Sequence, residues 1–163
     1  MALWLSACSP TLDWREVRPE DSRALALFPC KPSTDARMVS LAGARVRMVL
    51  ASCRAGDATY ALAFADVAEP AKVGPALAAL RAASVANLGA AAQVIGPLKV
   101  EGMTPNPQAE RVRFSGKFPN GDAVTQEAGL FAKGTGVYQA TVMGQRVDVE
   151  AVDTFFAGLK LPT

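Results

Sequence analysis

The sequence predicts an α+β domain, with an antiparallel sheet of about six to eight strands and one long and one short helix packed on it. Three observations predict this class. Strand-like alternation occurs in two blocks, before residue 68 and after residue 97; a stretch with helical periodicity separates the blocks; and a short helical pattern ends the chain. Strands joined by short connections favour antiparallel pairing, and the helices would then cover the sheet.

The first block predicts an antiparallel meander. A half-polar edge strand is expected at 13–17, and the two prolines of 28–32 make that segment rigid and irregular. Short turns at Ala42-Gly43 and Gly56-Asp57 then connect three alternating runs. These runs predict strands at 37–41, 44–54 and 59–67.

A helix is expected between Pro70 and Gly96, beginning near Pro75. Alanines supply helix propensity, and one stripe of residues recurs at three- and four-residue spacing. The stripe contains Val73, Leu77, Leu80, Ser84, Leu88, Ala91 and Ile95. The side chains on the opposite face of the helix are small. The helix therefore either simply covers one face of the sheet or leaves room there for a ligand.

The second block predicts four more strands and the short helix. Asn120-Gly121 favours a type I′ hairpin turn, and 133–136 reads as a second hairpin turn rather than a phosphate cradle. Asp148 is expected to cap the final helix and Gly158 to end it. The strands are expected at 98–103, 110–118, 123–131 and 137–143, the helix at 147–156, and a brief strand or tail at 159–161.

The N-terminal run Leu5-Ser6-Ala7-Cys8 resembles the lipobox of bacterial lipoproteins. The resemblance implies cleavage before Cys8 and a lipid on its sulfur. Only seven residues precede Cys8, without Lys or Arg, so we expect the true start upstream. Residues 1–7 are then a signal-peptide remnant, 8–12 a lipid-anchored tether and 13–163 one domain. The alternative is a cytosolic protein with an apolar N-terminus.

The expectation of export also predicts which membrane the lipoprotein reaches and whether its remaining cysteines are oxidised. Ser9, rather than an acidic residue, follows Cys8, and in a Gram-negative host this resembles the signal for outer-membrane rather than inner-membrane sorting. The resemblance implies an outer-membrane lipoprotein facing the periplasm. Cys30 and Cys53 are then one possible disulfide in an oxidising compartment. The alternative is two buried free thiols. A structural zinc site is not expected, because two cysteines without histidine do not complete one.

Composition excludes several functions. The chain has no histidine, so a Ser-His-Asp or Cys-His catalytic arrangement is impossible within it. The net charge of +2 and the lack of stacking platforms argue against nucleic-acid binding. Arg45 and Arg47, like Arg111 and Arg113, alternate along strands. They form either a basic strip for phosphate or lipid head groups or, as we favour, the solvated face of half-buried strands.

The candidate site residues are few. Trp14, Phe155 and Phe156 are a possible ligand or partner surface, although such aromatics are more often core contacts. The carboxylates of Asp148, Glu150 and Asp153 are explained by helix capping and the helix dipole, which leaves a carboxylate-dependent hydrolase as a distant alternative. No cofactor and no metal site are predicted.

The arrangement of elements, ending in a short helix with Phe155-Phe156 and a short apolar tail, is similar to that of PsbP-like and DcrB-like envelope lipoproteins. This resemblance implies a binding or assembly accessory rather than an enzyme. Together with the lipobox resemblance, it leads us to expect a non-catalytic protein that binds an unidentified envelope protein and is attached to the membrane through the lipid on Cys8. The alternative is a carrier of a small molecule or lipid, with an apolar pocket between the sheet and the long helix.

Overall fold

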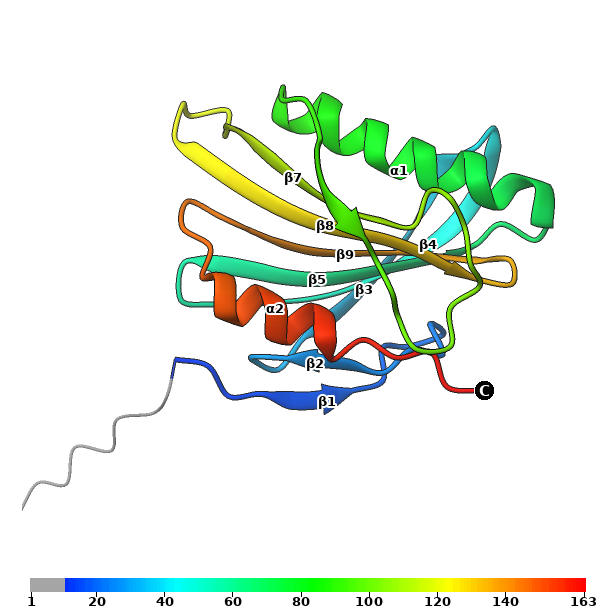
Figure 1. Cartoon of the computed structure of the whole chain (residues 1–163), viewed down its shortest axis with the longest axis horizontal. Coiled ribbons are helices and arrows are strands. Elements are labelled where there is room, and N and C mark those ends of the chain that lie inside the picture. The colour runs from blue at the N-terminus through cyan, green and yellow to red at the C-terminus, as the bar shows by residue number, and fades with distance from the viewer. Residues whose placement is uncertain (1–10) are drawn as a thin grey trace, which may run out of the picture.

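The computed structural model describes residues 11–163, so the expected lipobox and Cys8 lie outside the described residues. A seven-stranded antiparallel sheet forms the centre of the domain. A long helix covers one face, and a short helix with a two-stranded ribbon covers the other (Figure 1). The predicted α+β class, with one long and one short helix on an antiparallel sheet, is confirmed.

Two meanders meet in the middle of the sheet. β5 and β9 lie side by side there, and the strand order is β3-β4-β5-β9-β8-β7-β6. The first meander consists of β3 (Ser33–Leu41), β4 (Ala44–Ala55) and β5 (Ala58–Asp66). The second consists of β6 (Gln93–Pro97), β7 (Glu110–Lys117), β8 (Ala123–Lys133) and β9 (Gly136–Gly144).

The long helix connects the two meanders. A 3₁₀ turn at Pro70–Lys72 leads into α1 (Val73–Leu88), which buries Val73, Ala76, Leu77, Leu80 and Ser84 against the sheet. The expectation that this helix reaches Gly96 was wrong. Gly89 takes the left-handed conformation (φ 61°) that ends a helix, and the following residues pair with β7 as the edge strand β6.

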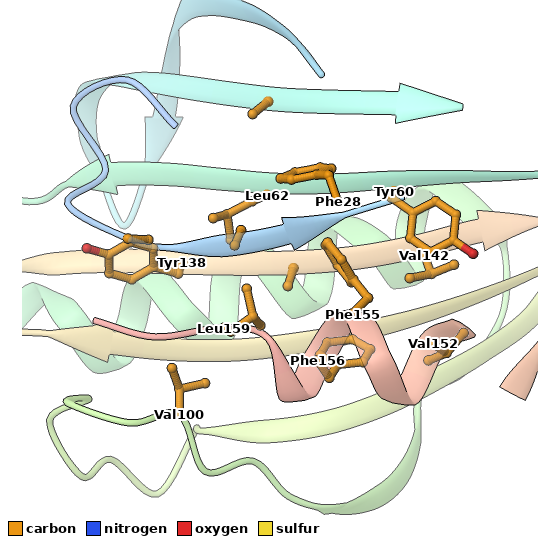
Figure 2. Close-up of a cluster of buried hydrophobic side chains, with 14 of the residues drawn as sticks. Phe28, Tyr60, Leu62, Val100, Tyr138, Val142, Val152, Phe155, Phe156 and Leu159 are labelled. Atoms are coloured by element: carbon orange, nitrogen blue, oxygen red, sulfur yellow. The ribbon is translucent and has the colours of Figure 1, made fainter. Parts of the chain in front are cut away.

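The opposite face is covered by β1 (Arg15–Val17), β2 (Ala26–Phe28) and α2 (Val149–Ala157). Phe28, Tyr60 and Phe155 form an edge-to-face aromatic cluster there, with ring centroids 5.4 and 5.5 Å from that of Phe155 (Figure 2). The Asp148 carboxylate accepts hydrogen bonds from the backbone N–H groups of Glu150 and Ala151, so the predicted helix cap is confirmed.

Two local expectations were wrong. Residues 98–103 form an irregular segment with a single bridge between Glu101 and Lys160, because Leu98 and Val100 are buried beside α2 instead of pairing in a ladder. The turn after β7 is not type I′. Gly121 alone has positive φ there (91°). Its N–H donates to the Phe118 carbonyl, so the central residues of the turn are Pro119 and Asn120, and the ring of Pro119 excludes the positive φ that a type I′ turn needs at that position.

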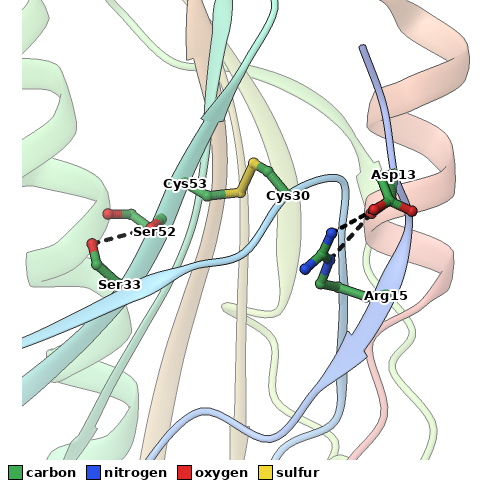
Figure 3. The surroundings of a disulfide bond; sticks show 6 residues. All are labelled: Asp13, Arg15, Cys30, Ser33, Ser52 and Cys53. Carbon is green, nitrogen blue, oxygen red and sulfur yellow. Dashed lines mark hydrogen bonds and ion pairs between the residues drawn. A yellow bond between two sulfur atoms is a disulfide. The ribbon is translucent and has the colours of Figure 1, made fainter. Parts of the chain in front are cut away.

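Cys30 and Cys53 form a disulfide with 5.9 Å between their Cα atoms (Figure 3). It joins the segment after β2 to β4 and closes a sequence separation of 23 residues. The expected pairing is therefore present, and it indicates an extracytoplasmic domain, because such bonds persist in oxidising compartments. Within residues 11–163, no helix is long and apolar enough to cross a membrane.

Candidate functional site

A cavity of about 870 Å³ opens on the face of the sheet that carries α2, at the end where β4 begins and β5 ends. Its floor is apolar and consists of Val49, Phe64 and Tyr138. The strand registers place these three side chains on adjacent strands of the same face. The Phe64 and Tyr138 rings lie 5.0 Å apart, and Phe131 stacks on Tyr138 from the other side at 4.9 Å. The floor is thus held rigidly by the sheet and the core.

Charged side chains form the rim. Arg47 on β4 donates a hydrogen bond to the Asp21 carboxylate at 2.7 Å, with side-chain exposures of 51% and 58%. An ion pair this exposed is worth at most about 1 kcal/mol, so an incoming anion can replace the carboxylate at little cost. Arg23 also lines the cavity and makes no ion pair with any residue of the described part of the chain. Two guanidinium groups are therefore accessible at the rim.

The loop that presents Asp21 and Arg23 is held in an unusual conformation. Both residues have positive φ, 61° and 55°, which costs an arginine about 1 kcal/mol or more. Ser22 between them is buried, and its hydroxyl donates to the Pro19 carbonyl. Its own carbonyl accepts a 2.5 Å hydrogen bond from the Tyr138 hydroxyl. Strain that the surroundings enforce is typical of binding sites, and here it positions two charges at the cavity rim.

Tyr138 forms part of the cavity floor, and its hydroxyl also holds the loop that contains Ser22. Burial raises the pKa of its hydroxyl to about 12, against the opposing effect of the Arg23 charge and with a further increase from Asp66. The hydroxyl therefore stays protonated and continues to donate to Ser22 throughout the physiological range.

The remaining wall comes from the second meander and the C-terminal segment. The Lys133 ammonium donates to the carbonyls of Leu161 and Pro162 at 3.0 and 3.1 Å. The predicted hairpin turn at Gly134 is confirmed by the pairing of Lys133 with Gly136. The Gly134 N–H donates to the Thr104 hydroxyl at 3.0 Å, which fixes the turn against the loop before β7.

This arrangement suits recognition of an anionic group that carries an apolar moiety. Arg23 and Arg47 supply planar donors for a carboxylate, phosphate or sulfonate. Phe64 and Tyr138 supply apolar surface below them. The cavity volume falls within the range of about 300–1,000 Å³ that is usual for small-ligand sites.

The aromatic residues expected at a binding surface lie elsewhere. Phe155 and Phe156 are buried in the core, so they do not form the ligand or partner surface considered for them. The helical period directs both rings toward the sheet. Trp14 is half-buried and contacts Tyr60 edge-on, with ring centroids 6.2 Å apart. The alternative interpretation, that these aromatics are core contacts, describes Phe155 and Phe156, whereas Trp14 is a partly buried residue packed against the same core.

The paired arginines of β7 also differ from expectation. Arg111 and Arg113 are not a solvated strip, because both hold the buried carboxylate of Glu127 on β8. Arg111 also pairs with Asp153 at 2.8 Å and lies 4.7 Å above the Phe156 ring. Burial by itself lowers the pKa of Arg111. Its hydrogen bonds to Glu127 and Asp153 outweigh this effect, so the pKa of Arg111 lies above the ordinary value. Asp153 thus serves a structural network, as Asp148 serves the helix cap.

The space between the sheet and α1 is filled. Leu77 and Leu80 pack into the sheet, and the Ser84 hydroxyl accepts hydrogen bonds from Gln126 and Gln139 at 3.2 and 3.1 Å. The cavity described above contains no residue of α1, and neither does a smaller one of about 370 Å³ at the other end of the sheet. Neither of these two cavities therefore lies between the sheet and α1, where the carrier alternative expected its pocket.

No protein-family model matches the chain, and no curated protein matches it.

Proposed function

We propose that the protein is a non-catalytic binding protein of the cell envelope, held on the outer membrane by lipid on Cys8 and facing the periplasm. The lipobox-like run Leu5-Ser6-Ala7-Cys8 supports the anchor. The Cys30–Cys53 disulfide supports export independently, since it requires an oxidising compartment to persist.

The observation that carries binding is the cavity of about 870 Å³ with two accessible arginines above an aromatic floor. In this proposal an envelope partner inserts an anionic group with an adjoining apolar part. The guanidinium groups of Arg23 and Arg47 bind the charge, and Phe64 and Tyr138 contact the apolar part. Asp21 moves away from Arg47 as the anion arrives, which is possible because both side chains are more than half exposed.

A small-molecule carrier remains the second candidate, and the cavity volume supports it. Its site would be this cavity, not the filled space beneath α1. Native mass spectrometry of protein purified from the envelope separates the two: a carrier retains a small ligand, whereas an accessory protein is recovered without one.

The binding site is tested with anilinonaphthalene sulfonate, an anionic probe with aromatic rings, by fluorescence titration of the full chain. The double variant Arg23→Ala/Arg47→Ala should weaken binding by about tenfold or more, because it removes both charge-assisted contacts. Arg54→Ala is the matched control, since Arg54 is also on β4 but lines the smaller cavity. Equal affinity for all three proteins would place probe binding elsewhere and contradict the proposal.

A further inference from the structure

The outer edge of β3 is a surface that the proposed cavity does not use. β3 is nine residues long and lies at one end of the sheet, and its first six residues are exposed. Its register with β4 is continuous from Ser33 to Leu41. Within residues 11–163, no strand pairs with its outer side. A long, regular edge of this kind is a template for another strand.

The opposite edge of the sheet is built differently. β6 has five residues, a register shift between Val94 and Gly96, and a terminal proline at Pro97. Bulges and prolines prevent strand addition, and proteins use them to protect edges. β3 has neither feature along its length, so it is the edge suited to pairing.

The backbone groups that face outward follow from the turn after β3. The two-residue turn Ala42-Gly43 makes Leu41 and Ala44 a hydrogen-bonded pair. The odd-numbered residues of β3 therefore bond to β4, and the even-numbered ones direct their N–H and C=O groups outward. In agreement, the Ala36 N–H donates to its neighbour Asp35 at 3.0 Å and not to β4.

We infer that β3 pairs with β3 of a second copy of this chain, antiparallel and around a two-fold axis at Ala36. Outward-facing residues must lie opposite one another, so the axis passes through a residue and not between two. At Ala36 it places Asp35 of each copy opposite Arg37 of the other. These are non-hydrogen-bonded positions, where cross-strand side chains approach most closely.

Charge selects this register over its neighbours. An axis at Asp35 would oppose two carboxylates, and an axis at Arg37 would oppose two guanidinium groups. Neither residue has an ion-pair partner within residues 11–163. On pairing, the exposed Asp35 carboxylate exchanges its hydrogen bond from the Ala36 N–H for Arg37 of the second copy, and the Ala36 N–H is released to the new strand. The Ala36 axis also sets Met38, which is 51% exposed, opposite Thr34 on the other face of the strand. The interface is self-complementary, as a two-fold dimer requires.

Sedimentation velocity over a range of concentrations tests the dimer, using the full chain with Cys8→Ala so that lipid does not mediate association. The chain should show a monomer–dimer equilibrium. Arg37→Asp alone, or Asp35→Arg alone, should raise the dissociation constant about tenfold, because each places like charges opposite one another twice. The combined variant Asp35→Arg/Arg37→Asp should restore dimerisation. Val94→Lys on β6 is the control and should leave the equilibrium unchanged.

Amide hydrogen exchange tests the register. The N–H groups of Thr34, Ala36 and Met38 should become protected as concentration rises, and those of the odd-numbered residues should not change. A chain that is monomeric at every concentration would overturn the inference. So would a dimer that Arg37→Asp leaves intact, or one that Val94→Lys dissociates.

Discussion

At the scale of single residues, Tyr138 connects the core to the cavity rim. Its ring stacks on Phe131, and its hydroxyl holds the strained loop through the Ser22 carbonyl. The alternation of β9 shows that Tyr138 shares a face with Ala140 and Val142. Its partner is a backbone carbonyl 116 residues away in sequence, which no local pattern identifies.

The pKa of Tyr138 predicts a pH dependence. Its value is raised from 10.0 to about 12 in the folded chain, chiefly by burial. This contribution to stability is complete below pH 10 and is lost as the pH rises from 10 toward 12, because the unfolded chain ionises first. Tyr60, whose pKa burial also raises, acts in the same direction. Tyr138→Phe should flatten the decline measured by urea unfolding across this range; an unchanged pH profile would contradict the assignment.

At the scale of elements, the sequence predicts most strands and both helices because their burial is periodic. Seven strands and both helices were located by alternation, period and capping signals such as Asp148. β2 and β6 were missed, because each has only three or five residues and adjoins a proline or glycine. The segment 98–103 has a strand-like composition, but it is buried by α2 and the C-terminal segment, which are tertiary contacts.

Glu127 joins three elements and gives a prediction at this scale. Its buried carboxylate accepts hydrogen bonds from Arg111 and Arg113 of β7. Arg111 also donates a hydrogen bond to Asp153 of α2. Glu127→Ala should lower the free energy of unfolding by about 3 kcal/mol, because two partly buried guanidinium groups lose their counter-charge. Glu110→Ala, which breaks the more exposed pair with Arg81, should cost about 1 kcal/mol or less. Urea unfolding of both variants makes the comparison, and equal losses would refute the structural role of Glu127.

At the scale of the whole molecule, two meanders pair through β5 and β9 and form one continuous sheet. One face of this sheet is covered by α1, and the other face has a cavity at one end. The cavity combines the turn at 21–23, residues of the four strands β4, β5, β8 and β9, the hairpin turn at 134–135, Thr104 and the C-terminal segment. Its residues are scattered along the chain and form no motif. The sequence pattern therefore indicated Arg47 only as part of an alternating strip, and 133–136 only as a hairpin turn.

The proposed lipid anchor and the Cys30–Cys53 disulfide are the basis of the proposed envelope location, and one measurement tests both. It is the intact mass of the protein recovered from the membrane fraction of a bacterium that expresses its gene with the codons upstream of Met1. We expect the mass of a chain that begins at Cys8, increased by acyl groups and decreased by the two hydrogens lost when Cys30 and Cys53 form the disulfide. A soluble, unmodified chain beginning at Met1 with both thiols free would contradict it.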